Sequence, residues 1–488
     1  MRIIGKLETI LAAAMLCSVP ASHAQQMPMP PQEHVAHQQG ATTGIAPQFP
    51  RLGRAQEHAE GEFLTLDELQ KIAADSNPTF RQAEAEIRAA KARQQQSGLY
   101  PNPTVGYIGD EIRGGSVGGG RQGFYVQQTV VTGGKLRLNR EAFAKDIDLA
   151  TIEAEEQRTR VRTAVKMAFL RVLAAQELRD ARRDLANIAQ DALETQRRLQ
   201  NTGQADDTEV LDAEVEAERM RMAARMQENT LREEWRSLTA VIGQPDMPLA
   251  TVSGDLEHGW PDLNESSAMD AIAKDSPAIR IAAAAESRAQ ASLARAKREA
   301  IPDLLLRGGL EYNHETLGSV PFAKGWEGIA EASVQIPVFN RNQGNVAAAQ
   351  ADSQRASGER QRIALTLRER AASIVDQYAN ARLMAVEYRD ELLPRARKSY
   401  SLMFEKYGRM LASYPRVLDT QRKLYGLQLE YIAALETVWT NGIALEGFLL
   451  TDGLEAPARP GEVDLPIRET NVPMPERTMS PQEPRLLR

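Results

Sequence analysis

Cysteine is nearly absent from the 488-residue sequence, and the single one, Cys17, lies in a segment with the features of a secretory signal. A positively charged start precedes a short apolar run, which small residues end at Ala24. Leu16 stands before Cys17, whereas a lipoprotein processing site favours a small residue at that position. We therefore expect residues 1–24 to be removed, which leaves a mature chain without disulfides or thiol chemistry.

The sequence also has few aromatic residues and no excess of basic ones. Aromatic side chains make up 5% of the chain, and 59 Lys and Arg stand against 66 Asp and Glu, for a formal net charge of −7. A nucleic-acid-binding surface would need a clustered basic patch, so we expect no nucleic acid partner. After the signal, no uncharged apolar stretch reaches the ~18 residues that a membrane-spanning helix needs. Long periodic runs of Ala, Arg, Glu, Gln and Leu predict a mainly helical protein.

Histidine is too scarce and too scattered to suggest a catalytic or metal site. The sequence has six histidines, and those outside the N-terminal region are His258 and His314. These two have neither metal-ligand nor catalytic-triad spacing, so we expect no enzyme activity, no cofactor and no metal site.

Both ends of the mature chain have a composition that does not support a packed core. Residues 25–62 are rich in Pro, Gln, Met and His, which is typical of an extended arm. The His and Met side chains of this arm could also bind copper or zinc weakly. Residues 455–488 contain repeated prolines and predict a second extended segment, the C-terminal tail.

Glycine and proline are both missing between Gly134 and Gly203, an unusually long interval. A single helix over 135–201 would be roughly 100 Å long at ~1.5 Å per residue. No ordinary globular domain needs a helix of that length. Part of the stretch has a seven-residue repeat in which Leu and Ala occupy the recurring position, at Leu178, Leu185, Ala192 and Leu199. This spacing is typical of a coiled coil, in which small alanines allow close approach.

The chain divides into two similar halves, a first repeat at 63–245 and a second repeat at 267–454, joined by a linker at 246–266. In each half, Ser or Asn before a proline predicts a helix start, and a second proline marks the change to extended chain. The expected helices lie at 66–98, 135–201, 206–242, 267–300 and 344–407, with a last helix that ends at Gly447. The expected strands lie at 104–112, 123–131, 304–315 and 329–338. Pro394 predicts a kink in the second long helix. Two shorter helices stacked end to end would match the long one of their half.

The expected strands of the second half alternate apolar and polar residues. In 304–315, Leu306 and Leu310 share one face, while Arg307 and Glu311 share the other. A half-buried sheet of a soluble domain and a transmembrane barrel would both show this pattern. Four strands cannot close a barrel alone, although several copies of the chain could.

The order of these features resembles the TolC-like outer-membrane efflux channel family, over about 64–454. The resemblance rests on the repeated order of elements and on short motifs that recur in both halves. The motifs are Gln128 to Gly134, Ile336 to Gly344, Gly203 followed by Val210-Leu211-Asp212, and Gly408 followed by Val417-Leu418-Asp419. Tyr100-Pro101-Asn102-Pro103 and the N-terminal arm resemble the heavy-metal branch of the family, whose members export copper or cobalt, zinc and cadmium.

The resemblance implies a mainly α protein with a small β part. Duplicated helix–strand–strand–long helix–helix units of a homotrimer would form an α-helical barrel in the periplasm, topped by a shared twelve-strand β-barrel in outer-membrane lipid. Such channels are passive exit ducts of tripartite efflux systems, docked by a periplasmic adaptor protein and driven by an inner-membrane RND-type pump. The alternatives are a periplasmic coiled-coil adaptor and a coiled-coil structural protein. The adaptor family has one helical hairpin, whereas two are expected here.

The resemblance also implies candidate residues at the pore entrance. In the family, acidic residues on the returning helix past the second tip narrow the entrance, and Asp419 matches one of these positions. Arg416 stands where the family has a neighbouring acidic residue, which implies an Asp–Arg pair at the closed entrance. Glu209 and Asp212 occupy the equivalent places in the first half. The alternative for Asp419 is a helix N-terminal acid that the helix dipole favours.

The tips at 201–205 and 408–413 match the family's adaptor-docking ends. The residues concerned are Gly203, Gln204, Gly408 and Ser413. Glycine at these tips is also expected to serve the turn itself, with or without a partner.

Overall fold

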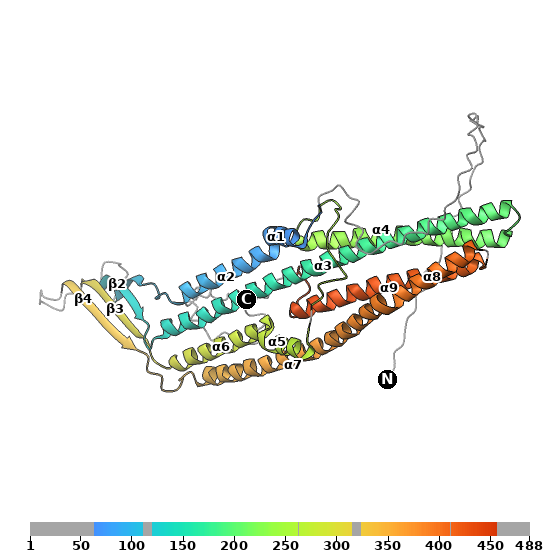
Figure 1. Cartoon of the computed structure of the whole chain (residues 1–488). Helices are drawn as coiled ribbons and strands as arrows, with labels where there is room; N and C mark the ends of the chain where they lie inside the picture. Colours follow the sequence, from blue (N-terminus) through green and yellow to red (C-terminus); the bar gives the residue numbers. More distant parts are fainter. Residues whose placement is uncertain (1–62, 111–119, 262, 315–323, 410, 456–488) are drawn as a thin grey trace, which may run out of the picture. The chain divides into compact units, whose positions relative to one another are not determined.

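The computed structural model describes residues 63–110, 120–261, 263–314, 324–409 and 411–455. These residues form a mainly helical structure with one small antiparallel sheet (Figure 1). The signal, the N-terminal arm and all but the first residue of the C-terminal tail lie outside the described residues. Within the described ranges, no helix is long and apolar enough to cross a membrane.

The same order of elements occurs twice along the chain. The first half contains α1 (Leu66–Ser76), α2 (Pro78–Ser97), β1 (Thr104–Asp110), β2 (Arg121–Val130), α3 (Lys135–Asn201) and α4 (Asp207–Ile242). The second half contains α5 (Glu265–Asp275), α6 (Pro277–Arg298), β3 (Leu304–Asn313), β4 (Gly325–Val334), α7 (Gln343–Glu387), α8 (Leu393–Gly408) and α9 (Tyr414–Glu446). The 67-residue helix α3 has the bounds that its flanking glycines predict.

Short polar motifs set the start of the first two helices. Thr65 caps α1 through a capping box, in which the Glu68 carboxylate accepts from the Thr65 backbone N–H at 2.8 Å. Asn77 ends α1 and caps α2, and Pro78 occupies the first turn of α2, where its missing N–H costs nothing. The helix start predicted at Pro78 is therefore confirmed, but the single helix expected over 66–98 is divided here into α1 and α2.

Helix α3 is the element along which most other helices pack, including α2, α4, α6 and α9 (Figure 1). Between residues 161 and 176 nearly every side chain of α3 is buried, so partners cover it on all sides. Toward its C-terminal end, Ala192 of the repeat is buried, as is Ala181, which lies between the repeat positions Leu178 and Leu185, while Leu185 is half-buried. Small residues therefore sit where the helices approach most closely, as the seven-residue spacing predicts.

Helices α1 and α4 meet end to end alongside α3. Gly243 ends α4 with a φ of +82°, and a Cβ there would lie 2.7 Å from the Ser76 carbonyl oxygen. Asn77 Nδ2 donates to the Val241 carbonyl oxygen across this junction, at 2.7 Å. The predicted stacking of shorter helices against the long one is confirmed in the first half.

The second long helix is interrupted at the position predicted for a kink. Helix α7 passes into a π-helical segment, Tyr388–Leu392, before α8 begins. Pro394 has no backbone N–H, and its ring crowds the preceding turn, so regular helical hydrogen bonding fails here. The Leu393 N–H donates instead to the Tyr388 carbonyl, five residues back, which is the π-helical pattern.

The described strands form one antiparallel sheet in the order β1-β2-β3-β4. The prediction for the last strand, 329–338, is wrong by about four residues, because β4 spans Gly325–Val334. Pro337 cannot donate to a neighbouring strand, so it favours an earlier end. At the other end, Trp326 pairs with Tyr312 of β3, and their ring centroids are 5.5 Å apart.

The sheet exposes its apolar face. On β3, Leu310 is 62% exposed, whereas the adjacent Glu311 is 6% exposed. Glu311 and Asn313 are among the buried polar residues of the structure. A soluble domain would bury the leucine and expose the glutamate, so this sheet has the opposite polarity.

Candidate gate at the helical tips

The first tip is a glycine turn that joins α3 to α4. Gly203 has a φ of +72°, and the next N–H, from Gln204, donates to the Leu199 carbonyl at 2.9 Å. This geometry closes α3 and requires a left-handed residue, so the glycine serves the turn, as predicted. Asp206 then caps α4 by accepting from the Glu209 N–H at 2.8 Å.

The second tip, between α8 and α9, is built differently. Gly408 is the last residue of α8, and Arg409 follows with a φ of −93°. Ser413 precedes α9 and makes no side-chain cap hydrogen bond. The expectation that glycine is needed for this turn is wrong, because Gly408 lies within the helix and not at a left-handed position.

Arg416 and Asp419 lie one turn apart on the exposed side of α9. Asp419 Oδ2 accepts from Lys423 Nζ at 2.7 Å, and both side chains are largely exposed. Within the described part of the chain, Asp419 therefore pairs with Lys423 and not with Arg416. An Asp–Arg pair at the entrance would have to form between protomers.

Glu209 and Asp212 are exposed residues in the first turns of α4. The Glu209 backbone is held by the Asp206 cap, whereas its carboxylate faces solvent. Glu209 and Asp212 therefore lie near the first tip, and Arg416 and Asp419 lie near the second. Within the described residues, no hydrogen bond or ion pair joins the first two residues to the second two.

One ion pair that the sequence analysis missed joins α4 to α9. Arg422 Nε donates to Glu216 Oε1 at 3.2 Å, and the Glu216 side chain is only 16% exposed. When the two halves are aligned on their Val-Leu-Asp motifs, Arg422 corresponds to Val215, so the repeat gives no signal for the pair. The contact ties the returning helix of the second half to that of the first.

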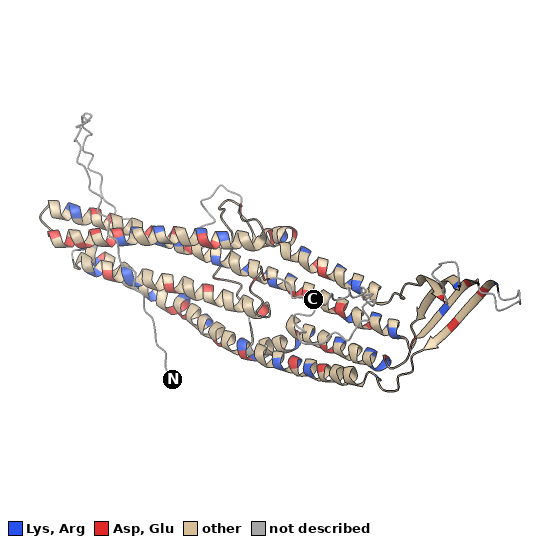
Figure 2. Ribbon diagram, turned by 180° about the vertical axis from the view of Figure 1, so that it is seen from behind, with Lys and Arg blue, Asp and Glu red and all other residues tan. Residues whose placement is uncertain are grey.

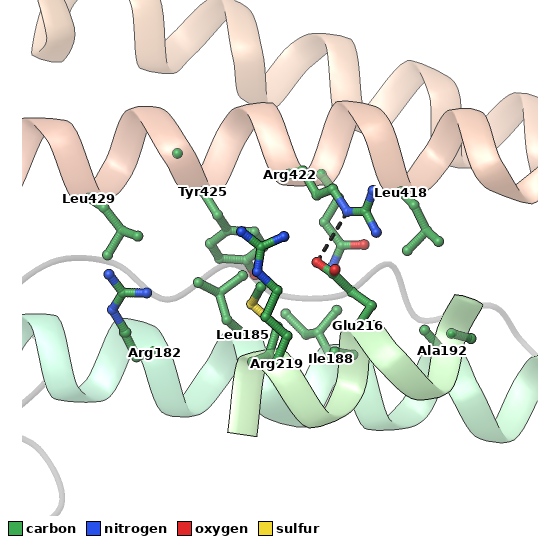
Figure 3. Close-up of a pocket in the computed structure, with 15 residues that line it drawn as sticks. Arg182, Leu185, Ile188, Ala192, Glu216, Arg219, Leu418, Arg422, Tyr425 and Leu429 are labelled. Carbon is green, nitrogen blue, oxygen red and sulfur yellow. Dashed lines mark hydrogen bonds and ion pairs between the residues drawn. The ribbon is translucent and has the colours of Figure 1, made fainter. Parts of the chain in front are cut away.

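A partly open pocket of about 300 Å³ lies beside this ion pair, bordered by α3, α4 and α9 (Figure 3). Leu185, Ile188 and Leu429 contribute apolar walls, and Tyr425 lies between them. Burial raises the pKa of the Tyr425 hydroxyl, which therefore stays protonated and neutral. The pocket lies between the α3–α4 hairpin and α9.

Charged side chains of both signs are interspersed along the helices (Figure 2). Many form pairs within one helix or between neighbours, such as Arg197 with Glu214, 2.6 Å apart near the first tip. Among the described residues, no group of three or more His, Asp or Glu is placed to hold a metal ion. The described contacts near the tips are therefore packing between helices and ion pairs.

Comparison with known proteins identifies the family. The family model of the outer membrane efflux protein matches residues 69–244 and 268–449, one segment in each half. The cobalt-zinc-cadmium resistance protein CzcC of Cupriavidus metallidurans is 24% identical over 409 residues, which cover 83% of this chain and 93% of that protein.

Solved structures of outer-membrane channels have the same fold. The crystal structure of CusC superposes with a TM-score of 0.65 at 17% identity, over 83% of this chain and 99% of that one. The structure of VceC from Vibrio cholerae gives a TM-score of 0.62 at 16% identity, over 80% of this chain and 97% of that one. The family match does not support an adaptor or a structural coiled-coil protein. The chain therefore belongs to the outer membrane efflux protein family, and it is an efflux channel of the outer membrane, not an enzyme.

Proposed function

We propose that the chain is the outer-membrane component of a tripartite efflux system and serves as its passive exit duct. Three copies would assemble into an α-helical barrel in the periplasm, continuous with a shared twelve-strand barrel in outer-membrane lipid. A periplasmic adaptor protein would dock at the tips, and an inner-membrane RND-type pump would drive transport. The proposal rests mainly on the sheet, whose apolar face is exposed and whose polar face is buried.

The sheet supports membrane insertion because its exposed face is the apolar one. Phe124 on β2, Leu310 on β3 and Trp326 on β4 are all largely exposed, while Glu311 is buried on the opposite face. This is the polarity of a barrel strand, apolar toward lipid and polar toward a lumen. Four strands per chain require further copies for closure, and three copies would supply the twelve that the family resemblance implies.

A stripe of exposed apolar side chains on α4 supports assembly of identical chains. Leu211, Val215, Met222 and Met226 each expose more than half of their surface. Their spacing of four, seven and four residues puts them on one side of the helix, which we call the α4 stripe. Scattered exposed apolar residues need no explanation, but four that lie on one side of a helix indicate a contact surface.

The closed entrance would form where the tips of the three chains converge. Asp419 and Arg416 lie on the exposed side of α9, where an Asp–Arg pair between protomers could form without breaking any core contact. Glu209 and Asp212 would line the same end from the first half. Docking of the adaptor at Gly203, Gln204, Gly408 and Ser413 would separate the tips and open the duct.

Reconstitution tests the channel. Purified full-length protein inserted into planar lipid bilayers should give stepwise ionic conductance, and the conductance should rise in variants with weakened tip contacts. Membrane fractionation should find the protein in detergent extracts of the outer membrane. Absence of conductance from protein that has inserted in the trimeric state would overturn the proposal.

We further propose divalent heavy-metal ions as the exported substrate. The relative from Cupriavidus metallidurans is named for resistance to cobalt, zinc and cadmium, and the Tyr100-to-Pro103 motif resembles the heavy-metal branch. A strain that lacks the gene should lose tolerance to these metals or to copper and regain it on complementation. Unchanged metal tolerance together with reduced tolerance to organic drugs would contradict this substrate.

A further inference from the structure

The pocket between α3, α4 and α9 combines an apolar interior with a cationic edge. Its volume of about 300 Å³ is at the lower end of the range of small-molecule sites. Leu185, Ile188 and Leu429 provide apolar contacts, and the ring of Tyr425 provides a flat surface on which an aromatic group can pack. Figure 3 shows these side chains lying between the three helices.

Three arginines from three different helices line the same pocket, namely Arg182 of α3, Arg219 of α4 and Arg422 of α9. Arg422 is neutralised by Glu216, 3.2 Å away. Arg182 and Arg219 have no carboxylate within ion-pair distance anywhere in the described part of the chain. The edge of the pocket therefore carries two guanidinium groups that form no ion pair within the described part of the chain.

We propose that this pocket binds an amphipathic organic anion with a compact apolar body. The body would occupy the space against Tyr425 and the leucines, and a carboxylate or sulfonate would lie between Arg182 and Arg219. Guanidinium groups bind such planar or tetrahedral anions through paired N–H donors. A cation of the same shape would be repelled by the same two side chains.

A bound anion would link the α3–α4 hairpin to α9, next to the Glu216–Arg422 pair. It would stabilise the present arrangement of the two hairpins relative to any arrangement in which they separate. Binding itself does not depend on channel activity. Reduced conductance in the presence of the anion is a consequence that rests on the proposed function.

Calorimetric titration of the full chain in a neutral detergent tests the site with a defined probe, 2-naphthalenesulfonate. We expect saturable binding that weakens with added salt. The amine 2-naphthylmethylammonium has the same ring and the opposite charge, and it should not bind. Absence of saturable binding of the sulfonate, or equal binding of the amine, would overturn the proposal.

Two variants separate the charge and the shape of the site. The double variant Arg182→Gln, Arg219→Gln should weaken binding of the sulfonate at least tenfold. Gly426→Leu should also weaken it, because Gly426 lines the pocket and a Cβ there meets no atom within 4 Å, so a larger side chain would reduce the free space beside Tyr425. This change places a better helix former in α9, so folding is not at risk.

The matched control is Arg183→Gln, at the next position of α3, where the guanidinium faces Glu228 at 3.9 Å and not the pocket. This variant should bind the sulfonate as the original chain does. Equal loss of affinity in the Arg183 variant and the double variant would show a general charge effect and would overturn the site. Measurement of conductance on the same proteins distinguishes failure of the binding site from failure of the channel.

Discussion

Gly203 is the residue whose backbone conformation most clearly limits substitution at the tips. Its φ of +72° is strained for any residue with a Cβ, while no neighbouring atom would obstruct that Cβ. Gly203→Ala should therefore destabilise the first tip by about 1 kcal/mol, through backbone strain alone. Hydrogen exchange of the Gln204 amide, which bonds to Leu199, should become about fivefold faster.

The second glycine supplies the matched comparison. Gly408→Ala lies in the last turn of α8, where alanine is the better helix former, so it should leave exchange at its tip unchanged or slower. Equal acceleration at both tips would contradict the distinction between the two turns.

The Glu216–Arg422 pair is predicted to hold the hairpins together. Arg422→Gln leaves the mostly buried Glu216 carboxylate without its partner, which should weaken the present arrangement of the hairpins by about 1 kcal/mol. Conductance in planar bilayers should then rise about fivefold. The exchanged pair Glu216→Arg, Arg422→Glu should restore the original value.

Lys423 provides the control for this prediction, because it is adjacent in sequence and its ion-pair partner among the described residues is the exposed Asp419 on its own helix. Lys423→Gln should change conductance little, since an exposed pair within one helix contributes only a few tenths of a kcal/mol. A similar rise in both variants would indicate a general effect of charge at the entrance.

Glu436 on α9 makes stability depend on pH in the opposite direction from most carboxylates. Burial, together with the nearby Glu234, raises the pKa of Glu436, although Arg171 partly offsets this effect. The folded state therefore holds the proton more tightly than the unfolded state, so stability falls as pH rises from about 4.5 through the raised pKa. Glu436→Gln should raise the melting temperature at pH 7, and the gain should vanish below about pH 4.5.

At the scale of whole elements, the sequence predicts those helix ends that are specified by residues at the end itself. Gly134 and Gly203 flank α3 with no helix breaker between them, and the predicted bounds are correct. The start of α2 is correct for a similar reason, because Asn77 and Pro78 specify it. The π-helical segment before Pro394 was not predicted. A proline indicates that helical hydrogen bonding is interrupted, but it does not determine which backbone hydrogen-bond pattern replaces it.

Contacts between distant elements could not be predicted from residue patterns. Alternation along β3 gave two faces but did not say which one is buried, because that depends on what covers the sheet. The Glu216–Arg422 pair likewise depends on the relative position of α4 and α9. The pore-entrance and docking residues remain proposals, because they concern contacts between chains.

At the scale of the whole molecule, the α4 stripe predicts assembly through this helix. Leu211→Lys combined with Met222→Lys should leave the fold of the chain intact, because both side chains are exposed, and should lower the trimer fraction at least tenfold. Cross-linking and size-exclusion chromatography in detergent measure this fraction.

Leu249→Lys is the control, since Leu249 is also exposed but lies outside the stripe in the segment after α4. It should not change the trimer fraction. Dissociation by Leu249→Lys to the same extent would exclude the α4 stripe as the specific contact.

The end-to-end junction of α1 and α4 has a consequence for how the length of the helical part can differ between members of this family. Asn77 and Gly243 fix the junction beside the middle of α3, and between it and the first tip α3 and α4 run as a helical hairpin that α9 contacts. Insertion of seven residues into α3 and seven into α4 would preserve their facing positions and move the tip by ~10.5 Å. The same paired insertion would be needed in α8 and α9. Evolution could thus adjust the duct to a wider or narrower periplasm by paired heptad insertions, without altering the membrane end.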